Sequence, residues 1–161
     1  MSTPGTDSLP VHSPFGDRDA DAPRILVADD DAVVVHTIVN ALKRAGYAVT
    51  AVSDGLKAWE ALTAQHYDLF LTDDQMPGLN GHELVRRARQ HKLRFPIIVV
   101  SGRFDFYLEP ENEEWDVAGF LRKPFSLPEL MEAVVSALQR QPAVAPRRHA
   151  DRAETAKPSA A

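Results

Sequence analysis

Short apolar runs alternate with amphipathic stretches through the middle of the chain. Each run is rich in Ile, Val, Leu or Phe and is bounded by polar or turn residues, which is typical of a buried strand. In the stretches between them, apolar residues recur at intervals of three and four, the spacing of a helix with one buried face. The predicted strands lie at about residues 25–28, 47–52, 69–71, 95–100 and 118–122.

Helix start and stop signals flank the amphipathic stretches. Lys43, Arg44 and Gly46 indicate the end of a helix that begins after Asp31. The segment from Ser126 to Glu129 is a capping box that opens the last helix. The predicted helices lie at about residues 32–45, 55–64, 81–90 and 127–140.

The segment 103–116 departs from this regular pattern. Pro110 would break a helix in its interior, so we expect a long ordered loop and then a short helix from Pro110 to about Asp116. Its aromatic residues are expected either to form a surface for a partner or to fill the core where a regular helix is missing. They are Phe104, Phe106, Tyr107 and Trp115.

Alternating strands and helices predict an α/β domain with a parallel sheet and helices on both faces. We predict a doubly wound, five-stranded, flavodoxin-like sheet of order 2-1-3-4-5 with an irregular or shortened fourth helix. The domain is expected to span residues 24–140. Residues 1–23 and 141–161 lack apolar periodicity and are rich in proline, so they are predicted to be disordered tails.

Polar residues follow four of the five predicted strands. Asp29 and Asp30 follow the first, Asp73 the third, Ser101 the fourth and Lys123 the fifth. Ligands of doubly wound sheets bind beyond the carboxyl ends of the strands, and the first and third strands would lie roughly 4.8 Å apart. Three carboxylates this close repel one another unless a cation is shared. An oxygen-only ligand set without His or Cys favours Mg²⁺.

Such a cluster is suited to phosphoryl transfer, which needs positioned cations and hydrogen-bond donors around the moving group. No His or Glu lies in the predicted cluster to serve as a general base. Asp73 is therefore expected to attack directly and to hold the phosphoryl group as an acyl phosphate.

Four stretches in this order resemble the receiver domain of two-component response regulators: ILVADDD, DLFLTDDQMPGLNG, PIIVVSG and FLRKPF. The resemblance covers roughly residues 24–140 and implies a stand-alone, single-domain receiver. It implies that Asp73, four residues before Pro77, is the phosphoacceptor. It also implies that Asp29 and Asp30 form the acidic pair, that Asp30 contacts Mg²⁺ directly, and that Gln75 offers its main-chain carbonyl to the metal.

The same resemblance assigns roles on the last two strands. Ser101 corresponds to the hydroxyl that bonds the phosphoryl group, and Lys123 to the lysine that pairs with it, with a cis Lys123–Pro124 peptide. Phe120 stands at the position of the switch aromatic, although ordinary core packing is an alternative. Gln75 and Arg103 occupy positions that tune the lifetime of the phosphoryl group, so their replacement by alanine is expected to change the dephosphorylation rate.

The implied partners are a histidine kinase or a histidine phosphotransfer protein, and a downstream protein target. The chain would not be an enzyme beyond its own phosphoryl transfer and slow autodephosphorylation. The composition, with 44% hydrophobic and 25% charged residues and no cysteine, is typical of a globular protein without disulfides. The net charge of −5 argues against a nucleic-acid-binding surface. Neither a signal peptide nor a membrane span is evident, so a cytoplasmic protein is expected.

Two other functions remain as alternatives. Asp29 and Asp31 superficially form the Asp-x-Asp signature of haloacid-dehalogenase-type phosphatases, but that family's acidic pair follows its lysine, whereas Asp73 and Asp74 precede Lys123. A degenerate receiver that acts as a phosphorylation-independent adaptor would be favoured if Asp73→Ala left its partner interactions unchanged. Asp31 and Asp74 are expected to be solvated or to cap helices.

Overall fold

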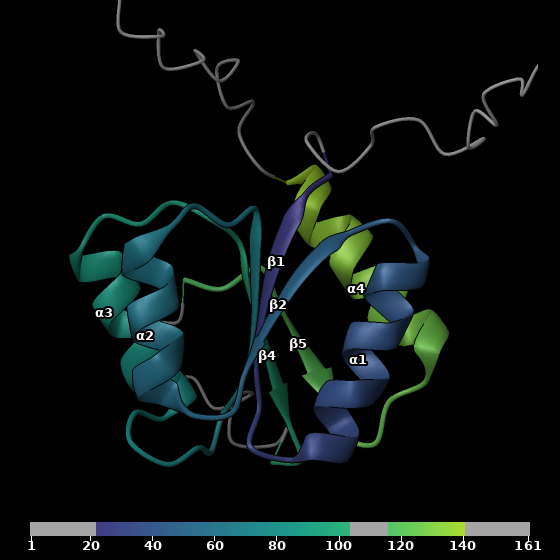
Figure 1. The fold of residues 1–161 in the computed structure, drawn as a ribbon, viewed down its shortest axis with the longest axis horizontal. Helices are drawn as coiled ribbons and strands as arrows, with labels where there is room; N and C mark the ends of the chain where they lie inside the picture. Colours follow the sequence, from purple (N-terminus) through teal and green to yellow (C-terminus); the bar gives the residue numbers. More distant parts are fainter. Residues whose placement is uncertain (1–21, 104–115, 141–161) are drawn as a thin grey trace, which may run out of the picture.

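The structure of the protein, a computed structural model, describes residues 22–103 and 116–140. Five parallel strands form one sheet in the order β2-β1-β3-β4-β5, which confirms the predicted topology (Figure 1). The strands are β1 (Arg24–Ala28), β2 (Ala48–Val52), β3 (Leu69–Asp73), β4 (Ile97–Ser101) and β5 (Gly119–Arg122).

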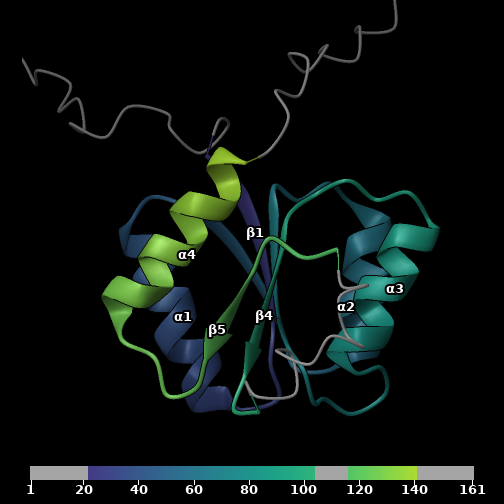
Figure 2. The same ribbon diagram turned by 180° about the vertical axis from the view of Figure 1, so that it is seen from behind.

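Two helices cover each face of this sheet, so the described part of the chain has three layers. α1 (Ala32–Arg44) and α4 (Leu127–Gln139) pack on one face, and α2 (Gly55–Ala64) and α3 (Gly81–Gln90) pack on the other (Figures 1 and 2). This arrangement buries both sides of the central strands, which explains their almost continuous apolar runs. β3 and β4 are buried at every residue.

Alternate residues of each strand supply two separate apolar clusters. In β1, Leu26 packs with the α2–α3 cluster, whereas Ile25 and Val27 pack with the α1–α4 cluster. In β3, Phe70 belongs to the first cluster, and Leu71 to the second. Because side chains alternate across a strand, a shift of pairing by one residue would exchange the two faces, so this pattern holds the register.

The predicted helix ends are largely confirmed. The Asp31 carboxylate caps α1 by accepting from the backbone N–H groups of Val33 and Val34, and Asp54 caps α2. Ser126 and Glu129 form the predicted capping box of α4. A second capping box, Asn80 with Glu83 on α3, was not predicted.

Several predictions concern residues that the structure does not describe. These are the loop, the short helix and the aromatic group expected within 104–115, and the two tails. Other predictions were imprecise at the ends of strands. β4 begins at Ile97 rather than near residue 95, because Pro96 has no backbone N–H to donate to the ladder. Within 22–103 and 116–140, no helix combines the length and the apolar character needed to cross a bilayer.

Candidate functional site

Strand register brings the predicted acidic residues together at one edge of the sheet. Ala28 of β1 pairs with Thr72 of β3, so the next residues, Asp29 and Asp73, lie side by side. One carboxylate oxygen from each of Asp29, Asp30 and Asp73 lies within 4.8 Å of the others. The structure therefore forms the predicted acidic cluster from residues 44 positions apart in the sequence.

The three carboxylates differ in how far their oxygens are already engaged. Asp29 is 2% exposed; its Oδ1 accepts from the backbone N–H of Asp31 at 2.9 Å and its Oδ2 from Lys123 at 2.7 Å. Asp30 is exposed, and no hydrogen bond or ion pair joins its carboxylate to another described residue. Asp30 thus has the carboxylate of this cluster that is most available to a ligand.

The ammonium group of Lys123 provides the positive charge beside these carboxylates. Its Nζ lies 2.7 Å from Asp29 Oδ2 and 3.2 Å from Asp73 Oδ1, so the side chain spans the distance from β5 to β1 and β3. Burial alone would lower the pKa of Lys123, but the hydrogen bond to Asp29 and the charge of Asp73 raise this pKa above its ordinary value. The ammonium group therefore stays charged at neutral pH.

Asp73 titrates abnormally because of where it lies. Burial and the charge of Asp29 raise the pKa of Asp73 to about 6, against the opposing effect of Lys123. Its Oδ1 also accepts from the backbone N–H of Asp74 at 2.9 Å. At neutral pH Asp73 is mostly ionised, which a nucleophilic carboxylate requires, but its charge is only partly compensated by Lys123.

This donor set fits a hard divalent cation. All the donors are carboxylate oxygens. Three carboxylates lie close together, and the single ammonium group of Lys123 cannot neutralise all three negative charges. Mg²⁺ prefers such oxygen ligands and keeps several waters, which suits a site whose Asp30 faces solvent. Asp30, Gln75 and Asn80 also line an adjoining cleft of about 360 Å³, which leaves room for those waters.

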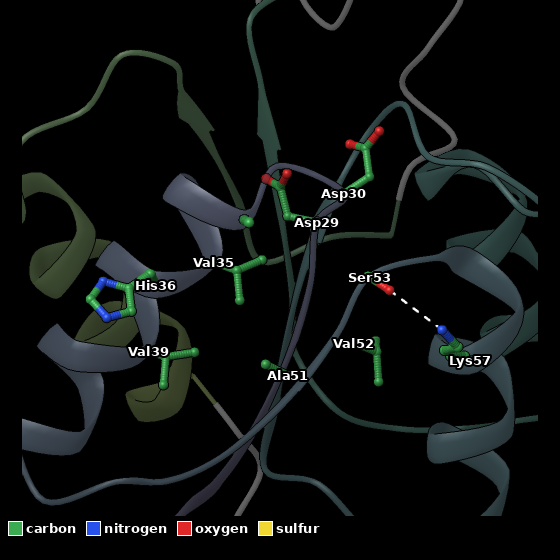
Figure 3. Close-up of a pocket in the computed structure, with 10 residues that line it drawn as sticks. Asp29, Asp30, Val35, His36, Val39, Ala51, Val52, Ser53 and Lys57 are labelled. Atoms are coloured by element: carbon green, nitrogen blue, oxygen red, sulfur yellow. Dashed lines mark hydrogen bonds between the residues drawn. The ribbon is translucent and has the colours of Figure 1, made fainter.

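A larger groove of about 530 Å³ opens on the other side of the acidic pair. Figure 3 shows Asp29 and Asp30 at one end of it, above Val39, Ala51 and Val52, with Lys57 reaching toward Ser53. Asp30 lines both the groove and the smaller cleft. The exposed carboxylate can therefore be approached from two directions.

The remaining predicted site residues occupy distinct positions. Ser101 ends β4, is 1% exposed, and its Oγ accepts from the backbone N–H of Arg103 at 2.9 Å. Phe120 on β5 is partly buried against the α2–α3 cluster, which fits core packing and leaves its role as a switch aromatic a prediction. Gln75 is exposed beside the small cleft. The Lys123–Pro124 peptide is cis, as the resemblance implied.

The prediction that Asp74 is solvated or caps a helix was wrong. Asp74 is 8% exposed, and its Oδ2 lies 3.3 Å from Arg103 Nη2. A carboxylate buried at this depth needs a compensating charge, which Arg103 provides from the loop after β4. The sequence carries no periodic signal for this pairing, because Arg103 lies in the loop after β4.

Two glycines that the sequence analysis did not single out allow helices α2 and α3 to pack closely against the loop that follows Asp73. A Cβ atom on Gly81 would lie 2.4 Å from the main-chain oxygen of Asp73, and one on Gly55 would lie 1.8 Å from that of Leu79. Both distances are shorter than contacts that real Cβ atoms make. The backbones of α2 and α3 therefore approach this loop as closely as only glycine permits.

Replacement of Lys123 by methionine is expected to destabilise the metal-free protein by about 2 kcal/mol, since it leaves Asp29 buried without its cation. Mg²⁺ should recover more thermal stability in this variant than in the wild-type chain, because the metal takes over charge compensation. Thermal unfolding with and without Mg²⁺ measures both effects. Lys43→Met, on the exposed last turn of α1, is the control. Equal midpoints for Lys123→Met and this control would contradict the role of Lys123.

Comparison with known proteins identifies relatives of the whole described domain. The family model for the response regulator receiver domain matches residues 25–135. The response regulator receiver protein CpdR of Brucella abortus is 37% identical over 111 residues, which are 69% of this chain and 92% of that protein. The transcriptional regulator NtrC of Rhizobium meliloti is 36% identical, but the match spans only 24% of its length.

Solved structures agree with these sequence relatives. A putative response regulator from Chloroflexus aurantiacus superposes with a TM-score of 0.68 at 30% identity, covering 74% of this chain and 99% of that one. The receiver domain of the sensor histidine kinase PA1611 from Pseudomonas aeruginosa has a TM-score of 0.65 at 28% identity, over 73% of this chain and 98% of that one. The latter structure has a magnesium ion coordinated in its active-site cleft.

Proposed function

The chain belongs to the receiver-domain family of two-component response regulators, and on that premise we propose that it is a phosphorylation-dependent switch that accepts a phosphoryl group on Asp73. The observation that carries this proposal is the convergence of Asp73, two further carboxylates and the Lys123 ammonium group at the end of the sheet. The proposed donor is a phospho-histidine of a histidine kinase or phosphotransfer protein.

In the proposed reaction an oxygen of ionised Asp73 attacks the phosphorus atom of the donor. The O–P bond forms while the N–P bond breaks, and the electron pair of that bond remains on the imidazole nitrogen, which then takes a proton. Lys123 lies 3.2 Å from Asp73 Oδ1, where it can neutralise charge on the transferred group. Ser101, at the end of the adjoining strand, is the proposed hydroxyl donor to a phosphoryl oxygen.

Mg²⁺ would be held by Asp30 and Asp73, with the main-chain carbonyl of Gln75 and waters, and would supply positive charge near the phosphoryl oxygens. Asp29 has a different part in this proposal. Because both of its oxygens already accept hydrogen bonds, it orients Lys123 and contributes negative charge to the metal site. The structure of the PA1611 receiver domain, which holds magnesium in its cleft, supports the choice of metal.

Mg²⁺ binding is expected to weaken as the pH falls below about 6, because protonation of Asp73 then competes with the metal. The raised pKa means that ionisation of Asp73 costs stability, so the metal-free protein loses stability as the pH rises from about 4 to about 6, and Mg²⁺ restores it. We expect a clear Mg²⁺-induced rise in unfolding temperature at about pH 8, and a dissociation constant about tenfold weaker at about pH 5. A stabilisation by Mg²⁺ that does not change with pH would contradict the metal role of Asp73.

Incubation with acetyl phosphate and Mg²⁺ tests the proposed function directly. The expected result is one phosphoryl group per chain, located on Asp73 by borohydride trapping and peptide mass analysis. Sustained hydrolysis of a chromogenic phosphomonoester would instead support the haloacid-dehalogenase-type alternative. Absence of any label on Asp73, together with unchanged partner binding by Asp73→Ala, would support the adaptor alternative.

Output through protein–protein contacts is also part of the proposal, together with a domain that spans residues 24–140 and a cytoplasmic location. Receiver domains are signalling domains, and the match to the receiver protein CpdR spans 92% of that protein and 69% of this chain. The downstream target is proposed only as a protein that distinguishes the phosphorylated from the unphosphorylated form. Pull-down with Asp73 phosphorylated and unphosphorylated would identify such a target.

A further inference from the structure

Asp74 is a fourth carboxylate beside the phosphoacceptor, and the chemistry described above does not use it. It is buried, and its backbone N–H donates to Asp73 Oδ1 at 2.9 Å. Its side chain also lies within hydrogen-bond reach of the Asp73 carboxyl and, after burial and the charge of Asp29, helps to raise the pKa of Asp73. A negative charge this close would repel an incoming phosphoryl group unless a cation compensated it. Lys123 pairs with Asp29 and Asp73, whereas the cation that pairs with Asp74 comes from another loop.

Arg103 is that cation, and its contacts with Asp74 are long. Nη2 and Nε of Arg103 lie 3.3 and 3.4 Å from Asp74 Oδ2, beyond the usual range of charge-assisted hydrogen bonds. The Arg103 side chain is 58% exposed, so its guanidinium has room to turn. An ion pair with this geometry compensates the buried charge but gives up little when the guanidinium moves to a stronger anion.

The backbone of Arg103 is held beside the other predicted ligand of the phosphoryl group. Its N–H donates to Ser101 Oγ at 2.9 Å. Because the serine oxygen accepts this bond, the hydroxyl hydrogen remains able to donate to a phosphoryl oxygen. Arg103 is thus tied to the site twice, by its backbone to Ser101 and by its side chain to Asp74.

We propose that Asp74 is a positioning residue that holds the Arg103 guanidinium beside Asp73 until the phosphoryl group arrives, and that the guanidinium then binds the phosphoryl oxygens. The inference rests on the proposed function, since it concerns the same transfer to Asp73. A phosphoryl group carries more charge than a carboxylate, and the planar guanidinium matches its oxygens with paired donors. Lys123 compensates the site from the Asp29 side, and Arg103 does so from the Asp74 side.

The initial rate of labelling by acetyl phosphate and Mg²⁺ tests the pair. Arg103→Gln removes the cation paired with Asp74 and keeps the Asp74 charge, so we expect the rate to fall by about tenfold. Asp74→Asn added to Arg103→Gln removes the negative charge beside Asp73 and should raise the rate again by about threefold. Arg103→Lys keeps the charge and should label faster than Arg103→Gln. The control is Arg86→Gln on the exposed side of α3, which should match the wild-type rate.

The melting midpoint of each variant separates positioning from a general structural role. We expect the rates to differ at a temperature where every variant is folded, and not to follow the order of the midpoints. Labelling by Arg103→Gln at the wild-type rate would overturn the proposal, as would a double variant no faster than Arg103→Gln. If wild-type protein takes no label, the proposed function fails and this inference fails with it. Labelled wild-type protein with unchanged variants refutes the inference alone.

Discussion

Asp73→Asn is expected to abolish labelling by acetyl phosphate and by a phospho-histidine donor. An amide cannot form the acyl phosphate. Asp29, the other carboxylate paired with Lys123, already accepts a hydrogen bond on each of its oxygens. Asparagine keeps the shape of the side chain, so loss of label in a folded variant reports on chemistry. Mass analysis of intact protein measures the label, with Glu60→Gln on the exposed side of α2 as the charge-matched control.

The same variant should gain stability while it loses activity. Ionisation of Asp73 is unfavourable in the fold because burial and Asp29 raise its pKa to about 6. A neutral asparagine removes this penalty, which is about 1–2 kcal/mol at pH values near 8 once solvent screening of the site is allowed for. The metal-free variant should therefore unfold at a higher temperature than wild-type protein. A lower midpoint, or label retained at the wild-type level, would refute our account of Asp73.

Gly55→Ala is expected to destabilise the fold by about 2–4 kcal/mol. Alanine is the better helix former by about 1 kcal/mol, so helix propensity alone predicts the opposite sign. The contact decides the outcome, because the added Cβ would lie 1.8 Å from the main-chain oxygen of Leu79, and neither backbone can move without disturbing the loop of Asp73. Urea unfolding followed by circular dichroism measures the change.

Gly119→Ala on β5 is the matched control for this prediction. A Cβ atom there meets no atom of residues 22–103 or 116–140 within 4 Å, so the same chemical change should alter stability by less than about 1 kcal/mol. Equal unfolding midpoints for the two variants would show that α2 and the loop after β3 do not approach one another as closely as the structure indicates.

Comparison of prediction and structure separates two kinds of residue in the site. Asp29, Asp73 and Lys123 could be predicted to meet because each follows an apolar run, and parallel strands end at the same edge of a sheet. The pairing of Asp74 with Arg103 could not be predicted in this way. It depends on the path of the loop after β4, and loop conformation leaves no periodic pattern in the sequence.

The roles of Gly55 and Gly81 could not be predicted from the sequence either. Gly55 and Gly81 appeared only as ordinary residues near predicted helix starts, because a glycine that permits a close approach has the same letter as one in an open turn. Only the distance to a backbone far along the chain distinguishes them. The order of the strands, in contrast, was predictable, since only two orders are common among doubly wound sheets.

The alternation of apolar runs and amphipathic stretches, by itself, determined that this chain forms a doubly wound sheet with acids, a hydroxyl and a lysine at one edge. Those features are local, and burial of apolar surface leaves few ways to combine them. The tertiary structure decided which carboxylate stays available for a metal, which one Lys123 compensates and which one Arg103 compensates. Such assignments depend on distances of a few ångströms between groups on different strands and loops, where Coulomb energies and desolvation change steeply.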